Sequence, residues 1–229
     1  MQGCGKVGVL AFDLDGVLVK CRSSWRYLHL RFGSITIVES RDDARAFLEG
    51  RISYEEWMRR DLEAIIESAG RRLSREEIVN VFRDSELEEG AEEVVNYAKA
   101  LGIELAIVSG GIDILANMVA RRLGIRYVMA NKLVFDNNDL LIPRGIEIVN
   151  PLRKDEALLK ISRETGIPLN RFIYVGDTSW DVSAFRVVGY PVLYRRGEDP
   201  VNLGIEVYTI DRLAELKGIL RTICKMGTS

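Results

Sequence analysis

Two aspartates follow an apolar stretch near the start of the chain, in the sequence VLAFDLDGVLV of residues 9–19. Asp13 and Asp15 lie two positions apart, and a glycine follows them. Carboxylates held close together repel, and each raises the pKa of its neighbour unless a cation intervenes. A hard divalent ion such as Mg²⁺ relieves this repulsion, because it binds carboxylate oxygens and completes its shell with water and substrate phosphate. The pair therefore indicates a metal site that acts on a phosphate group.

Polar groups also end two later apolar stretches. VSGG places Ser109 before two glycines, and VGDTSWD contains Asp177 and Asp181. A hydroxyl and free N–H groups at a helix start, with flexible glycines behind them, suit an anion. Lys154, near the start of a predicted helix, adds a positive charge. Each motif alone is common in turns and helix caps, so the prediction of one shared site depends on their combination.

The elements that must position these groups alternate between strand and helix patterns. Apolar residues at helical spacing predict helices at 90–102 and 151–166, and short apolar runs predict strands at 7–12, 103–109, 171–177, 190–194 and 205–210. This alternation is typical of an α/β fold with a doubly wound, Rossmann-like parallel sheet. In such a sheet ligands bind beyond the carboxyl ends of the strands, where the aspartates and the serine fall.

One long segment, residues 20–89, interrupts the alternation. It contains several helical patterns, each begun by a serine and several closed by glycine, and no convincing strand. We therefore expect a helical cap at 20–89, inserted after the first strand of a catalytic core that comprises 1–19 and 90–229. Within the core, residues 130–143 carry two short apolar runs around Asn-Asn-Asp, which predict a β-hairpin.

Composition excludes several classes of protein. The 229 residues are 47% hydrophobic, which is enough to bury a core, and the net charge of −2 supplies no field for nucleic acid or an anionic membrane. Neither partner is expected, and no feature indicates an oligomeric state. The first residues carry too short an apolar stretch for a secretory signal or a membrane span, so we expect a cytoplasmic protein.

Histidine and cysteine usage narrows the chemistry further. His29 is the only histidine, which excludes most catalytic triads and histidine-ligated metal sites, so carboxylates must move the protons. Cys4, Cys21 and Cys224 are scattered and form no CxxC pair, and we expect three free thiols.

Four segments together resemble a known family. DLDGVLV, VSGG, the lysine of NPLRKDEALL and VGDTSWD have the order and type of the four motifs of the haloacid dehalogenase-like hydrolases. The stretch EEGAEEVVNYAKALGIELAIVSGG, with a helical cap after the first motif, is similar to the phosphoserine phosphatase branch. The resemblance implies an Mg²⁺-dependent phosphomonoesterase that hydrolyses a small phosphorylated metabolite through an aspartyl-phosphate intermediate.

The resemblance also implies a role for each motif residue. Asp13 would be the nucleophile, and Asp15 would protonate the leaving oxygen and then activate water. The phosphoryl oxygens would be held by the Ser109 side chain, the Gly110 N–H and Lys154. Mg²⁺ would be held by the Asp13 side chain, the Asp15 backbone carbonyl and Asp177, with Asp181 acting through water or as an outer partner.

The sequence departs from the branch where the substrate is selected. Phosphoserine phosphatases carry a glutamate seven residues after the second aspartate of the first motif, and Arg22 stands there. The cap arginine that meets the substrate carboxylate falls at Asp61, with Arg60 beside it. These three residues are the expected specificity positions, and the phosphoserine recognition pair is expected to be reversed or absent. Trp25, Tyr54 and Trp57 of the cap are interpreted as packing or surface residues.

Two other functions remain open. A phosphotransferase or mutase of the same superfamily would pass the aspartyl-phosphate to an alcohol instead of water. A catalytically silent ligand-binding module would use the scaffold without turnover, although the retained Asp13 and Asp15 argue against it, because binding alone needs no nucleophile.

Overall fold

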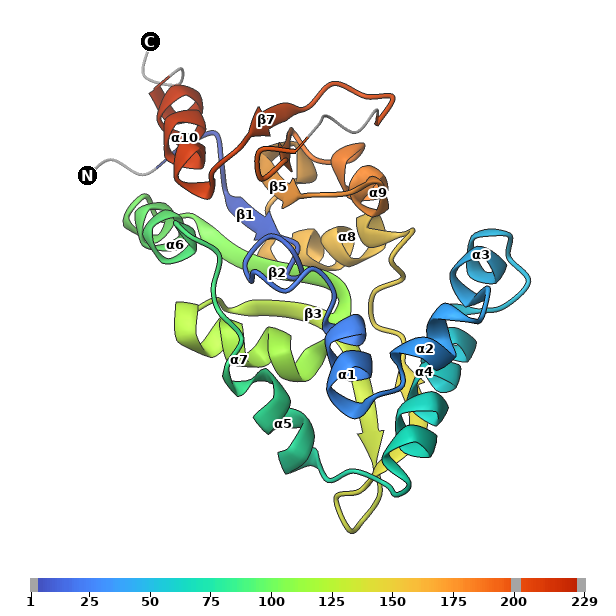
Figure 1. Ribbon diagram of the computed structural model, residues 1–229. Coiled ribbons are helices and arrows are strands. Elements are labelled where there is room, and N and C mark those ends of the chain that lie inside the picture. The colour runs from blue at the N-terminus through green and yellow to red at the C-terminus, as the bar shows by residue number, and fades with distance from the viewer. Residues whose placement is uncertain (1–3, 199–202, 226–229) are drawn as a thin grey trace.

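A seven-stranded sheet forms the centre of the computed structural model, which describes residues 4–198 and 203–225 (Figure 1). The strands lie in the order β4-β3-β2-β1-β5-β6-β7. All neighbours pair in parallel except β3 and β4, which are antiparallel. The strands are β1 (Val9–Phe12), β2 (Glu104–Ile112), β3 (Tyr127–Phe135), β4 (Leu141–Ile146), β5 (Phe172–Gly176), β6 (Tyr190–Tyr194) and β7 (Tyr208–Ile210). The α/β fold predicted from the alternating patterns is confirmed.

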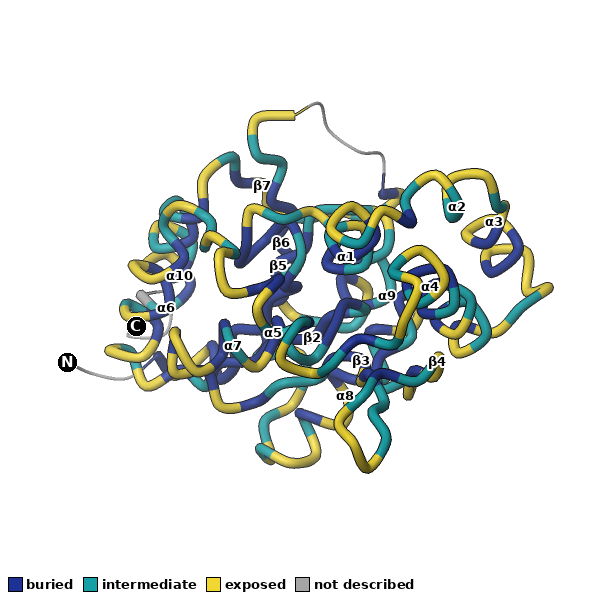
Figure 2. The backbone as a smooth tube through the Cα atoms, turned by 60° about the horizontal axis from the view of Figure 1, so that its bottom comes forward, coloured by how far each residue is buried: buried dark blue, intermediate teal, exposed yellow. Residues whose placement is uncertain are grey.

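Helices cover both faces of the sheet, because the apolar strands alternate their side chains between two cores. Leu10 and Phe12 of β1 pack on the core that includes α6 (Ala91–Ala100), α7 (Asp113–Leu123) and α10 (Leu216–Lys225). Val9 and Ala11 pack on the second core, with α8 (Lys154–Thr165) and the short helix α9 (Val182–Phe185). Figure 2 shows β2 and β5 in the buried interior of this arrangement, whereas β7 and β4 at the two edges of the sheet are partly exposed. Three short 3₁₀ turns lie at Leu169–Arg171, Ser179–Asp181 and Leu213–Glu215.

Five helices occupy the segment 20–89. They are α1 (Ser24–Phe32), α2 (Ile35–Glu39), α3 (Asp43–Leu48), α4 (Tyr54–Ala69) and α5 (Arg75–Arg83). Serine side chains cap α1, α4 and α5 at their N-termini, and left-handed glycines end α1 and α4, as their flanking residues predict. The short helix α2 was not predicted. Division of the chain into a core and a cap stays a proposal, supported by this block of helices.

The predicted hairpin is formed by β3 and β4, but it is longer than 130–143 and belongs to the main sheet. Strand β3 begins three residues earlier, at Tyr127, and pairs in parallel with β2. Strand β4 supports the cap, because Gly145 lies against Met58 of α4, where a Cβ would approach the methionine sulfur to 2.7 Å. The hairpin therefore connects the sheet to the longest cap helix.

The two ends of the described chain are joined by a disulfide between Cys4 and Cys224. The prediction of free thiols is therefore wrong for these two cysteines, while Cys21 is free. Their separation of 220 residues explains the error, since no local spacing pattern reveals that the N-terminal segment runs beside α10. Among the described helices, none combines the length and apolar character needed to cross a membrane.

Candidate active site

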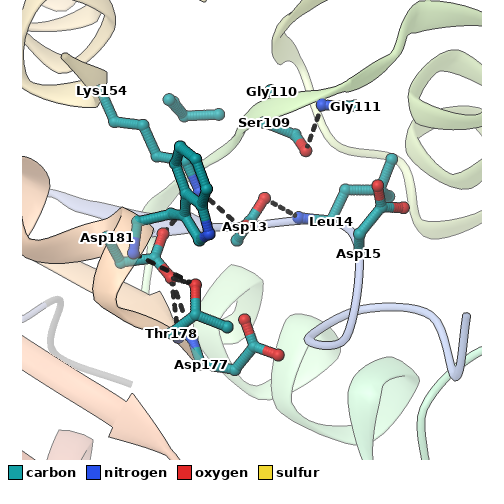
Figure 3. Close-up of polar contacts among 12 residues, drawn as sticks. Asp13, Leu14, Asp15, Ser109, Gly110, Gly111, Lys154, Asp177, Thr178 and Asp181 are labelled. Carbon is teal, nitrogen blue, oxygen red and sulfur yellow. Dashed lines mark hydrogen bonds and ion pairs between the residues drawn. The ribbon is translucent and has the colours of Figure 1, made fainter. Parts of the chain in front are cut away.

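The carboxyl ends of β1, β2 and β5 meet at one edge of the sheet. Strand β1 lies between the other two, and Phe12 pairs with Ile107 of β2 and with Val175 of β5. Asp13, Ser109 and Asp177 each lie one or two positions beyond these paired residues. The parallel register thus brings together side chains that are far apart in the sequence (Figure 3).

Asp13 and Asp181 share the ammonium group of Lys154. The Nζ lies 2.6 Å from Asp13 Oδ2 and 2.6 Å from Asp181 Oδ1, and all three residues are buried. Asp13 Oδ1 accepts a hydrogen bond of 2.7 Å from the Leu14 N–H. Burial raises the pKa of Asp13, and the lysine opposes this shift. Burial lowers the pKa of Lys154, but the two carboxylates outweigh it and the net shift is upward.

Three carboxylates form a site that fits a metal ion. One oxygen from each of Asp13, Asp177 and Asp181 lies within 4.8 Å of the others. Burial raises the pKa of Asp177 to about 8, and repulsion from the other two carboxylates adds to this effect. A divalent cation would offset that repulsion, and an all-oxygen set is the kind that Mg²⁺ accepts. The side chain of Asp15 is not part of this cluster.

Asp181 is already held by protein donors, which suits an orienting residue better than a direct ligand. Its Oδ1 accepts from Lys154 and, at 2.8 Å, from the Tyr174 hydroxyl. Its Oδ2 accepts from the backbone N–H groups of Asp177 and Thr178, at 3.0 and 3.1 Å. This network fixes the turn after β5 and so places the Asp177 carboxylate at the cluster.

Asp15 is held by the cap. The backbone N–H and hydroxyl of Ser24 donate to Asp15 Oδ2 at 2.9 and 2.7 Å, while Oδ1 is buried and has no hydrogen-bond partner among the described residues. Burial raises the pKa of Asp15 to about 6, although the bonds from Ser24 act in the opposite direction. A carboxyl group in this state can donate a proton near neutral pH. Ser24 itself was missed in the sequence.

Strand β2 runs past its predicted end at 109 to Ile112, with irregular pairing to β3 after Val108, and helix α7 begins only at Asp113. The segment after Ser109 is fixed by three donors that meet on one carbonyl. The Gly110 oxygen accepts from the Tyr54 hydroxyl at 2.8 Å, from Asn131 Nδ2 at 2.9 Å and from Trp25 Nε1 at 3.3 Å. Ser109 is buried, and its hydroxyl accepts from the Gly111 N–H at 3.1 Å. Tyr54 and Trp25 belong to the cap, so the cap and the predicted phosphate loop are directly connected.

Asn131 was also missed in the sequence. It is fully buried, and its Oδ1 accepts from the N–H groups of Ile148 and Val149 at 2.7 and 2.9 Å. Its Nδ2 donates to the Val149 carbonyl at 3.0 Å as well as to Gly110. The only sequence signal is a lone amide beside a lysine in an otherwise apolar run, VMANKLVF.

Two motif glycines make room for the aspartates. Gly16 has φ +74°, and a Cβ there would overlap Oδ2 of Asp177. A Cβ on Gly176 would overlap the carboxyl group of Asp181. The glycines of DLDG and VGD therefore act through close approach to a carboxylate, which a larger residue would displace.

A cavity of about 290 Å³ opens above these groups. Asp13, Asp15, Ser109, Lys154 and Asp177 all line it, as does Gly110. Four aromatic side chains also line it, Trp25, Tyr54, Trp57 and Trp180, together with Arg22, Ser23, Met58, Asp61, Gly111, Pro151 and Thr178. The interpretation of the three cap aromatics as packing or surface residues is therefore incomplete, since they also face the cavity.

The three predicted specificity positions have different surroundings. Asp61 lines the cavity and is buried, with Oδ1 at 3.5 Å from Nε2 of His29. Arg22 also lines the cavity, but its side chain is 62% exposed and forms an ion pair with Glu198. The structure thus brings Asp61 and Arg22 to the same cavity.

Arg60 is not among the residues that line this cavity. Its guanidinium binds Asp43 at 2.7 Å and Glu56 at 2.8 Å on the outer side of the cap. Neighbouring positions on α4 point in different directions, so Arg60 and Asp61 cannot both face the site.

Comparisons with known proteins agree with this geometry. The haloacid dehalogenase-like hydrolase family matches residues 7–189. Phosphoserine phosphatase from Methanocaldococcus jannaschii is 30% identical over 147 residues, which cover 64% of this chain and 67% of that protein. Phosphoserine phosphatase from Idiomarina loihiensis is 25% identical and is matched over 93% of this chain and 94% of its own.

Solved structures show the same likeness. A substrate-bound phosphoserine phosphatase complex superposes with a TM-score of 0.75 at 26% identity, covering 95% of this chain and 98% of the other. A phospho-aspartyl intermediate analogue of phosphoserine phosphatase matches with the same score and identity, over 95% and 99% of the two chains. The chain therefore belongs to the haloacid dehalogenase-like hydrolases, in the phosphoserine phosphatase-like branch.

Proposed function

We propose that this phosphatase uses Mg²⁺ to hydrolyse the phosphate monoester of a small alcohol, with Asp13 as the nucleophile. The observation that carries the proposal is the position of Asp13, whose carboxylate is held by Lys154 within the three-aspartate cluster and faces the cavity. The relatives named phosphoserine phosphatases make phosphoserine the first substrate to test, and the metal dependence of the family supports a cation at the cluster.

The chain supplies a group for each step of the reaction. An Asp13 oxygen forms a bond to phosphorus while the bond between phosphorus and the alcohol oxygen breaks, and Asp15 gives its proton to the departing alcohol. Asp15, now ionised, takes a proton from water, which attacks the aspartyl-phosphate. The products are the alcohol, inorganic phosphate and the restored carboxylate of Asp13.

The remaining residues position and neutralise the phosphoryl group. We propose that Lys154, the Ser109 hydroxyl and the Gly110 N–H hold its oxygens, since all three residues line the cavity beside Asp13. Bound at Asp13 and Asp177, Mg²⁺ would supply positive charge that offsets the charge of the phosphate. Such fixed charges and donors account for most of the catalysis of phosphoryl transfer.

The alternatives differ in their products. A phosphotransferase or mutase would need an acceptor alcohol and would release no inorganic phosphate without one. A silent binding module would turn over nothing, yet the buried Asp15 carboxyl with its raised pKa has no evident use in binding alone. Location in the cytoplasm stays a prediction from the sequence.

An Asp13→Asn variant tests the proposal. With p-nitrophenyl phosphate and Mg²⁺, the wild type should release inorganic phosphate without any acceptor, and the variant should lose at least a factor of about 10³, because an amide is a poor nucleophile. Asp155→Asn, on the first turn of α8 outside the cavity, is the matched control and should keep full activity. Unchanged hydrolysis by Asp13→Asn would refute the assignment.

A metal titration tests the cation separately. Activity should vanish in EDTA and return with Mg²⁺, and Mg²⁺ should raise the melting temperature of the wild type because it binds only the folded chain. Asp177→Asn should remove most of this thermal shift. A melting temperature and activity that ignore both EDTA and Mg²⁺ would contradict the proposal.

A further inference from the structure

Four aromatic rings, those of Trp25, Tyr54, Trp57 and Trp180, line the cavity beyond the phosphate-binding groups. Trp57 stands edge-on to Tyr54 with ring centroids 5.7 Å apart, and the Trp180 ring lies 6.5 Å from Trp57. Trp25 lines the same cavity, where its Nε1 donates to Gly110. The faces of aromatic rings attract cations, and tryptophan does so most strongly.

A carboxylate lies beside two of these rings. Trp25, Trp57 and Asp61 line the active-site cavity and also a second cavity behind it, so they form the partition between the two. Asp61 is 7% exposed. Its ion-pair partner among the described residues is His29, and the positive side chains of Arg26 and Arg41 line the second cavity but not the active-site cavity.

The cations of the active-site cavity are engaged elsewhere. Lys154 is held between Asp13 and Asp181 at the phosphate end. Arg22 lies largely in solvent and pairs with Glu198. At the leaving-group end, the partition therefore presents one negative charge and aromatic faces. A substrate carboxylate would meet repulsion there, whereas an ammonium group would gain both a counter-charge and ring contacts.

We propose that the preferred substrate is the phosphate monoester of an amino alcohol, whose ammonium group binds against Trp25, Trp57 and Asp61. This inference rests on the proposed function and names its leaving group. Ethanolamine phosphate and choline phosphate have this chemistry, in which a single positive group lies two carbons from the phosphoryl oxygen. Phosphoserine carries the same ammonium group together with a carboxylate that the partition does not accommodate.

Three substrates separate these possibilities in the wild-type enzyme. Ethanolamine phosphate has the ammonium, n-propyl phosphate replaces it with a methyl group at the same length, and phosphoserine adds the carboxylate. We expect kcat/KM for ethanolamine phosphate to exceed the other two by roughly tenfold or more, which is the worth of a hydrogen-bonded charge in a buried site. Equal rates for ethanolamine phosphate and n-propyl phosphate would overturn the proposal.

Variants locate the effect at the partition. Asp61→Asn should raise KM for ethanolamine phosphate by roughly tenfold with little change in kcat, and should leave n-propyl phosphate unaffected. Glu63→Gln, on the same helix but paired outward with Arg59, is the matched control and should change neither. The wild type could instead prefer phosphoserine and lose that preference in Arg22→Ala. Arg22 would then bind the substrate carboxylate and Asp61 the ammonium group, as a reversed recognition pair, and the proposal would be wrong.

An aryl phosphate keeps this test distinct from that of the proposed function. If p-nitrophenyl phosphate is hydrolysed in an Asp13-dependent manner while ethanolamine phosphate shows no preference, only the leaving-group assignment fails. If no monoester is hydrolysed at all, the proposed function fails first.

Discussion

Ser24 of the cap donates two hydrogen bonds to one oxygen of Asp15, from its backbone N–H at 2.9 Å and from its hydroxyl at 2.7 Å. The same hydroxyl accepts the Ile112 N–H of β2 at 3.1 Å. One buried side chain thus joins the first cap helix, the proposed general acid and the central sheet. The position of the cap and the orientation of Asp15 are therefore coupled.

Removal of this hydroxyl should impair turnover more than binding. Ser24→Ala leaves Asp15 with one donor fewer and freer to rotate, so we expect kcat to fall by roughly 10- to 100-fold while KM changes little. Ser53→Ala provides the control, because Ser53 is the N-cap of another helix in the same segment, α4, and its hydroxyl accepts from the Glu56 N–H. It should cost about 1 kcal/mol of stability and leave kcat intact. A Ser24→Ala enzyme with wild-type kcat would contradict the coupling.

Gly16 should be required for metal affinity as well as for its turn. An alanine there has the unfavourable φ of +74° and would press its Cβ on Asp177 Oδ2. We expect Gly16→Ala to raise the Mg²⁺ concentration for half-maximal activity by roughly tenfold, in addition to a cost of about 1 kcal/mol for the backbone. The measurement is an activity titration with Mg²⁺ beside a thermal melt.

Gly70→Ala separates the two effects of such a change. Gly70 ends α4 with φ +65°, and nothing lies within 4 Å of the position of a Cβ. The Gly70→Ala variant should melt at a lower temperature, because of the backbone cost, but should need the same Mg²⁺ concentration as the wild type for half-maximal activity. If Gly16→Ala and Gly70→Ala need the same Mg²⁺ concentration for half-maximal activity, Gly16 has no role beyond its turn.

The strands and the motif residues were predictable because their signals are local. An apolar run that ends in Asp13 identifies both a strand and its polar end, and the parallel register then brings the strand ends together without further information. The mutual geometry of Asp13, Ser109 and Asp177 follows from that register rather than from any single motif.

The residues that were missed act across long separations. Ser24 looks like an ordinary helix start, and its bond to Asp15 depends on how the cap folds back onto the core. Asn131 supports a carbonyl 21 positions away, and Cys4 reaches Cys224 across 220 positions. Within VGDTSWD nothing local marks Trp180 as a cavity residue, because its contact with cap aromatics exists only after both segments are placed.

The disulfide should contribute to stability but not to catalysis. It closes nearly the whole chain into a loop, which restricts the unfolded state, and such bonds typically contribute about 2–4 kcal/mol. We expect Cys4→Ser, or reduction of the wild type, to lower the melting temperature while kcat and KM stay unchanged. Cys21→Ser, at the free cysteine, serves as the control. A reduced wild type that melts at the same temperature would show that the bond contributes nothing in solution.

Asp61 should destabilise the fold in a manner that depends on pH. Burial raises its pKa, while His29 and Arg41 oppose the shift and Asp43 adds to it. Tyr54, which lines the same cavity, is the other titratable neighbour, and burial and Asp61 raise its pKa further. The folded state therefore holds the Asp61 proton more tightly than the unfolded chain does. The free energy of unfolding therefore falls as the pH rises from the pKa of Asp61 in the unfolded chain, near 3.9, through its raised pKa in the folded protein.

Replacement of Asp61 by asparagine removes the ionisable group and should reveal whether its ionisation lowers or raises the free energy of unfolding. Asp61→Asn should match the wild type in free energy of unfolding at pH values below the unfolded pKa and should become the more stable protein at neutral pH. Urea unfolding across this range measures the difference, with Glu63→Gln as the control substitution on the same helix. If Asp61→Asn is instead less stable at neutral pH, the pair with His29 outweighs the cost of burial, and Asp61 would be held in place by its neighbour rather than poised for a substrate cation.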